Sequence, residues 1–375
     1  MKFLHTADWQ LGMKAQNLGA VGNVIREQRL STAKKVIEIA NDHHVDFILI
    51  AGDVFEDNGV DRILIQKTAD ILSDFNRGVF IIPGNHDPLV PGSVWDHPVW
   101  KSSRNVQIIH EEKSLDLNGG ILYPCPVREK HSGKDPTSWI PSDRISGIKI
   151  GMAHGTVEGI HQTEPEYPIL RDAVQRTGLD YLALGHWHST ALYSATDGLI
   201  RMTYSGTHET TKFGERDSGN VLIVEITESG APPKITPVHS GLLSWEVIAE
   251  DIREQGDLSR IREKIEAKEN TKSTLIELNL NGLIFADEQQ ELQRIEEIIS
   301  SRFLYARTIT AQLRPSPEDE SWLANLPPGM LRETAQRLRD LADPNSTGNR
   351  PKESSPEIAS RALLELYSFI GEVSK

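Results

Sequence analysis

The sequence predicts an α/β protein whose main domain, residues 1–240, is a two-layered mixed β-sandwich flanked by helices. Strand-like apolar runs at 2–6, 47–51 and 79–83 alternate with helical segments at 26–44 and 62–75. This alternation is typical of βαβ units and parallel strands. Later apolar runs are short and separated by turn residues, which indicates that the sheets also contain antiparallel strands.

The predicted elements follow one another in a regular order through this domain. The segments 26–44 and 62–75 each repeat apolar residues at helical spacing. Two further runs, 148–153 and 181–184, have the length and composition of buried strands. Shorter strands are predicted at 106–109, 114–117, 121–123, 200–204, 220–226 and 234–239. These strands are numerous enough to form the two layers of the sandwich.

The rest of the chain predicts a small α+β domain at 241–314, followed by a helical tail at 315–375. Strands at 243–248, 274–280 and 303–313 alternate with helices at 258–268 and 287–301. In the tail, the segment 343–356 is rich in turn-forming residues, and 357–373 carries an apolar stripe at helical spacing. We expect this last helix either to pack on its own domain or to bind in a groove of a partner protein.

The composition limits the class of protein. A formal net charge of −14 on 375 residues disfavours tight nucleic-acid binding by this chain alone. The chain contains no apolar stretch near the roughly 20 residues of a membrane span, and its N-terminus has no apolar signal region. Its one cysteine, Cys125, cannot form an internal disulfide. We therefore expect a cytoplasmic protein with no membrane partner.

Five short polar clusters follow the predicted buried strands directly. They are Asp8-Trp9-Gln10, Gly52-Asp53-Val54-Phe55-Glu56, Gly84-Asn85-His86-Asp87, His154-Gly155 and Gly185-His186-Trp187-His188. In α/β sheets, ligands bind outside the carboxyl ends of the strands. Because all five clusters lie at such ends, we expect them to form a single site.

The side chains of these clusters are those that a centre of two divalent cations requires. Two such ions, about 3.5–4 Å apart, can bind the attacking and leaving oxygens of a phosphoester. Asp53 is suited to bridge the ions, and terminal ligands are available from Asp8, Asn85, His154, His186 and His188. His86, next to Asn85, is expected to contact the phosphate or to protonate the leaving oxygen.

The clusters resemble the signature of the calcineurin-like metallophosphoesterases, which runs Asp-x-His, Gly-Asp, Gly-Asn-His-(Asp/Glu), His and Gly-His-x-His. Residues 5–12, 204–207 and 213–215 resemble more specifically the SbcD-type nucleases of DNA double-strand-break repair. The resemblance implies one ion held by Asp8, residue 10, Asp53 and His188, and a second held by Asp53, Asn85, His154 and His186. It also implies that His86 is the catalytic histidine and that both ions are manganese, with magnesium as the alternative.

Gln10 departs from this family pattern, which has histidine at the same position. A glutamine can coordinate through its carbonyl oxygen, but it is a poorer donor than imidazole for metals that prefer nitrogen. We expect either that the first ion binds more weakly in this chain or that water replaces Gln10 as a ligand.

The resemblance implies a metal-dependent DNA nuclease, exonuclease or endonuclease, that processes DNA ends together with an SbcC-like coiled-coil ATPase. It further implies that 241–314 is a capping domain, that the tail binds the ATPase, and that a homodimer can form through 62–75. Two other functions stay open. One is a phosphodiesterase for nucleotides or other small phosphoesters, and the other is a DNA-end-binding subunit whose catalysis is weakened by Gln10.

Several aromatic and histidine residues near the clusters have alternative roles. Trp9, Trp187 and Phe213 either stack on a base or form the wall of the site. His5 is expected to pack or hydrogen-bond beside its strand, and His208 either borders the site or has a structural role.

Overall fold

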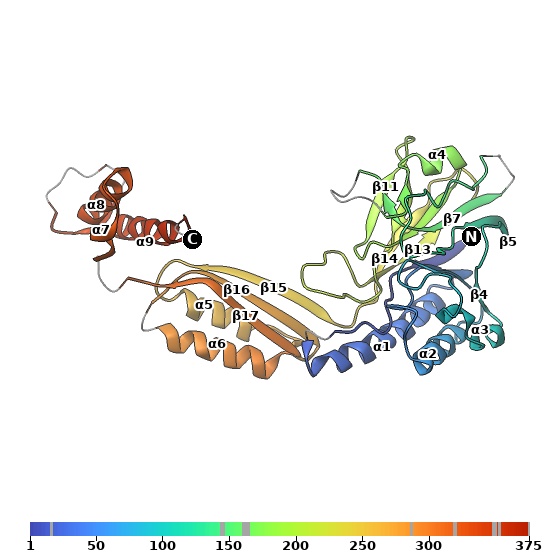
Figure 1. Ribbon diagram of the computed structural model, residues 1–375, viewed down its shortest axis with the longest axis horizontal. Helices are drawn as coiled ribbons and strands as arrows, with labels where there is room; N and C mark the ends of the chain where they lie inside the picture. The colour runs from blue at the N-terminus through green and yellow to red at the C-terminus, as the bar shows by residue number, and fades with distance from the viewer. Residues whose placement is uncertain are drawn as a thin grey trace. The chain divides into compact units, whose positions relative to one another are not determined.

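The computed structural model describes residues 1–15, 18–142, 147–159, 166–285, 288–317, 321–346, 351 and 354–373 (Figure 1). The chain divides into two compact units, Met1–Ser244 and Trp245–Lys375. The predicted fold class is confirmed, because the first unit contains mixed sheets flanked by helices. The division of the remainder into a capping domain at 241–314 and a tail at 315–375 stays a prediction. Among the described helices, none has the length and apolar content that crossing a membrane requires.

The first sheet of unit 1 has a parallel centre and an antiparallel edge. Its strands, in spatial order, are β14 (Lys234–His239), β13 (Asn220–Glu225), β1 (Lys2–Thr6), β2 (Phe47–Ala51), β3 (Gly78–Ile82) and β4 (Val106–Ile108). The strands β1 to β4 pair in parallel, whereas β13 runs antiparallel to β1. The helices α1 (Val21–Asp42), α2 (Arg62–Ser73) and α3 (Val99–Ser102) connect the parallel strands.

The second sheet also has a parallel centre. Its spatial order is β11 (Ala191–Ser194), β12 (Ile200–Tyr204), β10 (Tyr181–Gly185), β7 (Ile148–His154), β6 (Gly120–Pro124) and β5 (Leu115–Leu117). The four central strands are parallel and both edge strands are antiparallel. A short helix, α4 (Ala173–Thr177), precedes β10, and β8 (Thr156–Val157) pairs with β9 (Pro168–Ile169). The elements α3, α4, β8, β9 and β11 were not predicted, because each is too short to show a periodic pattern.

Alternation of side chains along the strands builds the core between the sheets. In β2, Phe47 and Leu49 face the second sheet, whereas Ile48 and Ile50 pack against the helices. Phe3 of β1 stacks on Phe47, with ring centroids 5.1 Å apart. Since both faces of the central strands are buried, the strands are nearly continuous apolar runs, which is typical of parallel sheets. Packing therefore fixes the carboxyl ends of both sheets relative to each other.

The second unit is built on one three-stranded sheet. The strands β15 (Ser244–Ile252), β16 (Thr274–Ile284) and β17 (Tyr305–Pro315) lie in that order, and β16 pairs in parallel with β17. The helices α5 (Asp257–Glu266) and α6 (Gln289–Arg302) bury their apolar residues against this sheet. The helices that follow are α7 (Ser321–Asn325), α8 (Met330–Ala342) and α9 (Pro356–Val373).

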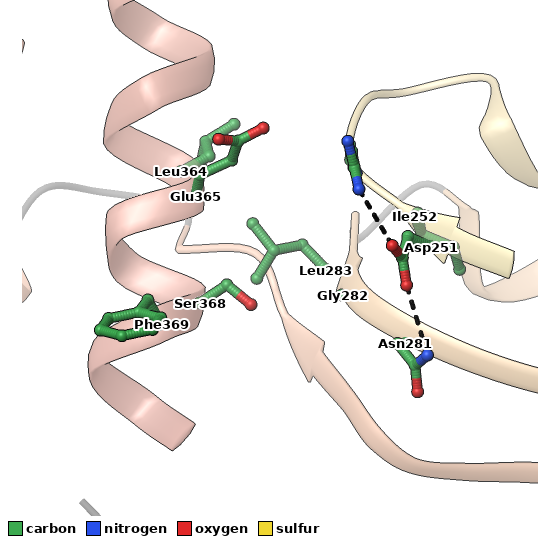
Figure 2. A pocket seen from close by; sticks show the side chains of 10 residues that line it. Asp251, Ile252, Asn281, Gly282, Leu283, Leu364, Glu365, Ser368 and Phe369 are labelled. Carbon is green, nitrogen blue, oxygen red and sulfur yellow. Dashed lines mark hydrogen bonds and ion pairs between the residues drawn. The ribbon is translucent and has the colours of Figure 1, made fainter. Parts of the chain in front are cut away.

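The apolar stripe of α9 packs within its own unit. Leu363 of α9 lies in a small core with Leu323 and Leu326, and Trp322 contacts the ring of Tyr367 at 5.0 Å between centroids. On another side, α9 faces β15 and β16 across a pocket of about 260 Å³, toward which Leu283 points (Figure 2). Part of the stripe is therefore packed, whereas Ile358 and Phe369 are exposed, and binding to a partner stays a prediction. The predicted segment 343–356 lies partly outside the described residues.

Candidate metal centre

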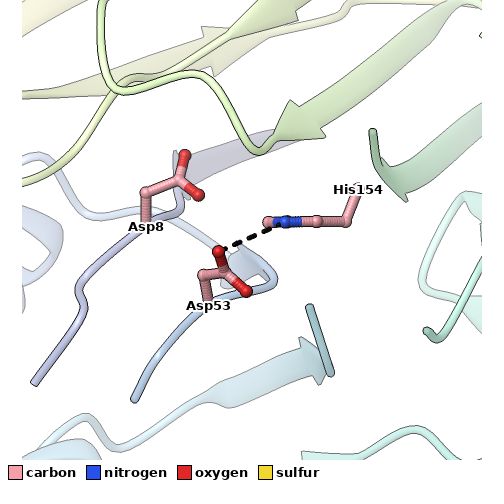
Figure 3. Close-up of side chains that lie close together, drawn as sticks. All are labelled: Asp8, Asp53 and His154. Atoms are coloured by element: carbon pink, nitrogen blue, oxygen red, sulfur yellow. Dashed lines mark ion pairs between the residues drawn. The ribbon is translucent and has the colours of Figure 1, made fainter. Parts of the chain in front are cut away.

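One histidine joins the carboxyl ends of the two sheets. His154, the last residue of β7, donates from Nδ1 to the carbonyl oxygen of Ala51, the last residue of β2, over 2.8 Å. Its Nε2 lies 3.4 Å from Oδ2 of Asp53. Asp8, Asp53 and His154 each offer a ligand atom within 4.8 Å of the others, and the three side chains converge in Figure 3. All three are buried, so these groups from three strands share one small space.

Asn85 and His186 extend this cluster. Oδ1 of Asn85 lies 2.8 Å from Nε2 of His154 and 3.0 Å from Nδ1 of His186. The structure therefore brings together Asp53, Asn85, His154 and His186, the four residues expected to hold the second ion. Asp8 belongs to the same neighbourhood, because its carboxylate accepts the backbone N–H of His186 at 2.9 and 3.1 Å.

The donor atoms of the cluster fit a divalent cation. With the proton of a neutral His154 ring on Nδ1, its Nε2 carries a lone pair, and that lone pair faces Asn85 Oδ1 and Asp53 Oδ2. These three atoms are all electron-pair donors, so they repel one another unless a positive charge lies among them. A metal-bound histidine usually donates its other ring N–H to a carbonyl or a carboxylate, as His154 does to Ala51.

The ring of His188 is also held by a hydrogen bond at Nδ1, with a carboxylate as the partner. Its Nδ1 lies 2.8 Å from Oε1 of Glu215 and 3.2 Å from the hydroxyl of Thr211. This leaves Nε2 as the ring atom that can bind a metal. Glu215 was not predicted as a site residue, although it belongs to a segment that carried the family resemblance.

Gln10 lies in the loop that follows β1. Its backbone N–H donates to the carbonyl oxygen of Asp53 over 2.9 Å, and the residue is 7% exposed. The hydrogen bonds that the structure gives Gln10 are made by its backbone, so its role as a ligand stays a prediction.

His86 is held close to the cluster without belonging to it. Its backbone N–H donates to Oδ1 of Asp53 over 2.9 Å, and its Nδ1 lies 2.9 Å from the carbonyl oxygen of Glu56. Because that carbonyl can only accept, Nδ1 carries a proton. Nε2 is then the atom that takes up or gives up a proton, as expected of a residue that protonates a leaving oxygen.

Close backbone approach explains why glycine precedes two of the ligands. A Cβ on Gly52 would overlap Nδ1 of His154, and a Cβ on Gly84 would overlap Oδ1 of Asp53. Any side chain at either position would push a ligand out of place. The glycines in Gly52-Asp53 and Gly84-Asn85 are therefore part of the site.

The backbone of the ligand loops is strained. The non-glycine residues with positive φ include Asp8 at 54°, Gln10 at 41°, Asp53 at 54° and His186 at 101°. Such conformations cost about 1–3 kcal/mol each and persist where the surroundings enforce them, often at functional sites. Four predicted ligands share this feature.

A buried arginine that was not predicted supports the first loop. Arg29 of α1 is fully buried, and its guanidinium donates to the carbonyl oxygens of Trp9 and Glu209 and to the hydroxyl of Thr207. Glu209, also fully buried, accepts the backbone N–H groups of residues 242 and 243. Nothing local in the sequence indicates these contacts, because each one joins segments far apart in the chain.

Asp87 joins two of the ligand loops. Its carboxylate accepts the backbone N–H of Gly84 at 2.7 Å and of Phe55 at 3.0 Å. Burial, and then the charge of Asp53, raise the pKa of Asp87 to about 7. The position of Asp87 next to His86 in the sequence could have identified Asp87 as a residue of the site.

Other residues singled out in the sequence have structural roles. His5 contacts the hydroxyl of Tyr181 and the carbonyl oxygen of Leu184, which confirms its predicted hydrogen bonding beside the strand. Trp9 is fully buried and donates to the hydroxyl of Thr6, so it is a wall residue and not a stacking surface. His208 is buried with its ring 5.1 Å from that of Trp9, and Cys125 is also buried.

Burial and mutual attraction set the charges of the cluster. Burial raises the pKa of Asp8 to about 6, although His154 and His188 oppose this shift. Burial alone would raise the pKa of Asp53, but His154 outweighs it and that pKa falls below its ordinary value. Burial likewise opposes a charge on His154, yet Asp53 and Asp8 raise the pKa of His154 above its ordinary value. Burial and the charge of His154 lower the pKa of His186 to about 3.

Replacing Gly84 tests the close packing of the site. We expect Gly84→Ala to lower the affinity for Mn²⁺ at least about tenfold, because the new Cβ displaces Asp53, and to lower the unfolding free energy by about 1–3 kcal/mol. Isothermal titration with Mn²⁺ and thermal unfolding measure the two effects. Gly133→Ala is the control, since a Cβ at Gly133 meets nothing within 4 Å. Unchanged Mn²⁺ affinity in Gly84→Ala would contradict this account.

Metal binding is expected to release a proton at neutral pH. The raised pKa of His154 means that the metal-free ring is protonated at pH 7, whereas a ring that binds metal through Nε2 is not. The Mn²⁺ affinity should therefore increase with pH until the raised pKa of His154 is passed. Calorimetric titration at pH 7 in buffers of different ionisation enthalpy counts the protons released. A count of zero would show that His154 is neutral before metal binds.

The chain is similar to several known proteins. A metallophosphoesterase of Bacillus subtilis strain 168, YhaO, is 26% identical over 372 residues, which cover 92% of this chain and 88% of that protein. The crystal structure of TT1561 of Thermus thermophilus aligns with a TM-score of 0.43 at 12% identity, over 64% of this chain and 98% of that one. Zinc-bound Vps29 of Entamoeba histolytica aligns with a TM-score of 0.32 at 16% identity, over 64% and 99%.

The match to a family covers the part of the chain that carries the site. Residues 1–190, half of the 375, match the sequence model of the calcineurin-like phosphoesterases, and this range includes every predicted ligand and His86. With Asp8, Asp53 and His154 arranged as a possible metal site, the chain belongs to the calcineurin-like phosphoesterase family of metal-dependent phosphoester hydrolases.

Proposed function

We propose that this chain is a nuclease that hydrolyses phosphodiester bonds in DNA and processes DNA ends. The observation that carries the proposal is the placement of His86 beside the cluster of Asp53, Asn85 and His154. An acid next to a metal-binding cluster is the arrangement that hydrolysis of a phosphodiester needs. Further support comes from the segment 204–215, which resembles the SbcD-type nucleases and contacts the site through Glu215.

The protein groups have separate tasks in this reaction. Bound divalent cations, which we propose to be manganese, would make a water molecule more acidic and stabilise negative charge on the phosphoryl oxygens. Asp8, Asp53, Asn85, His154, His186 and His188 would hold them, with Gln10 as a further candidate. His86 donates a proton from Nε2 to the oxygen that leaves, while Glu56 and Asp53 fix its ring and backbone.

The net charge of −14 requires that DNA binding has additional support. Carboxylates at the site are neutralised by the metals that they bind, which removes part of the repulsion. A partner subunit can supply a basic surface. We propose an SbcC-like coiled-coil ATPase as this partner, bound through α9, on which Ile358 and Phe369 are 57% and 60% exposed. A homodimer through α2 is a further proposal.

An assay on two substrates tests the proposed function. With Mn²⁺, the wild-type chain is expected to cut linear double-stranded DNA, and His86→Gln to lower kcat by about 10²–10⁴-fold without loss of bound metal. Cleavage of bis-p-nitrophenyl phosphate and cyclic nucleotides without cleavage of DNA would instead favour a phosphodiesterase for small phosphoesters. DNA binding without hydrolysis of any substrate would favour an end-binding subunit weakened at Gln10.

Shortening the chain tests the proposed partner. The full chain is expected to co-purify from its native cells with a large coiled-coil ATPase, and a chain that ends at residue 355 is expected to lose that partner, because the exposed apolar residues of α9 are gone. Mass spectrometry identifies the bound protein. Metal content serves as the control, since the predicted ligands all lie in unit 1. A partner retained by the shortened chain would rule out binding through α9.

A further inference from the structure

A pocket with aromatic walls opens beside the metal centre. It has a volume of about 340 Å³ and lies between the turn 186–189 and the segment 212–215. His186 and His188 line one side of it, so the pocket is continuous with the cluster. Pockets for small ligands commonly measure about 300–1,000 Å³. A group attached to a phosphoryl group at the cluster can therefore enter it directly.

The remaining walls combine aromatic rings with a positive charge. Trp187 is 39% exposed, Phe213 is half-buried, and both line the pocket. Lys212 beside them is exposed and, within the described part of the chain, forms no ion pair. Aromatic faces stack on bases of any sequence, and a lysine attracts phosphate. Glu215 also lines the pocket, and its carboxylate is bound to the His188 ring and to the backbone N–H of Thr211.

The pocket is held in shape by the same contacts that support His188. Glu215 bonds to the His188 ring and accepts the backbone N–H of Thr211 over 2.8 Å, which ties the segment 211–215 to the turn. On the far side of the turn, the N–H of Thr190 donates to the carbonyl oxygen of Asp217 over 2.8 Å. A surface ordered before binding loses little conformational entropy when a ligand stacks on it.

We propose that this pocket is a nucleobase subsite, a proposal that rests on the proposed phosphodiesterase function. A base next to the bond being cleaved stacks on Trp187 and Phe213, and Lys212 binds the phosphate beyond it. The chemistry of the walls accepts any base, because rings stack without reading hydrogen-bond donors and acceptors. The subsite would therefore select nucleotides over phosphodiesters that carry no base, without selecting a sequence.

Two chromogenic esters with the same leaving group isolate the contribution of the base. The p-nitrophenyl ester of thymidine 5′-monophosphate carries a nucleoside, and methyl p-nitrophenyl phosphate does not. We expect the wild-type chain with Mn²⁺ to prefer the thymidine ester in kcat/KM. In Phe213→Ala and Trp187→Ala this preference should fall at least about fivefold, the effect of losing one stacking ring. Phe285→Ala, which removes a half-buried aromatic ring from the unit without the metal cluster, is the matched control and should keep the preference.

The outcomes separate the subsite from the proposed function. Equal losses on both esters would mean that Phe213 and Trp187 only support the metal centre, and the subsite would be rejected. If the wild-type chain hydrolyses neither ester, the proposed phosphodiesterase function fails. Ligand binding then tests by itself whether the subsite exists. Isothermal titration with thymidine 5′-monophosphate and with deoxyribose 5-phosphate should then show tighter binding of the nucleotide, reduced by Phe213→Ala. Equal affinity for the two ligands would overturn the subsite.

Discussion

The hydrogen bond from His154 to the carbonyl oxygen of Ala51 is the contact on which the metal centre depends. It joins the end of β7 to the end of β2 and thereby connects the two sheets. The bond also directs Nε2 of His154 toward Asp53 and Asn85. One interaction therefore both connects the sheets and orients the nitrogen that can bind a metal. The glycines at 52 and 84 make this approach possible, because a Cβ at either position would occupy the space of a ligand.

The parts of the site that the sequence predicts are those tied to strand ends. Asp8, Asp53, Asn85 and His186 follow apolar runs whose bounds are easy to recognise, and the topology of parallel strands brings such positions to one edge. The bounds of β1, β2 and β14 are also as predicted; Gly52 marks the end of β2, and Pro233 and Ser240 flank β14. The short helices α3 and α4 escaped prediction, since four or five residues show no periodicity.

Supporting residues could not be predicted, because their role depends on contacts between distant segments. Glu215 lies 27 positions from His188, and Arg29 lies 180 positions from Glu209, with nothing between them to indicate the contact. A buried arginine is costly unless its donors are satisfied, and here four acceptors satisfy Arg29. Its pKa, lowered by burial to about 10, still leaves it charged at neutral pH.

The strain in the ligand loops explains why buried polar side chains and backbone hydrogen bonds gather near the cluster. Positive φ at Asp8 and Asp53 costs free energy that apolar packing alone does not recover at a polar site. Backbone hydrogen bonds offset this cost: the N–H of Asp8 donates to Gly52, and the N–H of Gln10 donates to Asp53. Arg29 holds the same loop through the carbonyl of Trp9. These protein contacts therefore hold the ligand loops in the strained conformation that places Asp8 and Asp53 together.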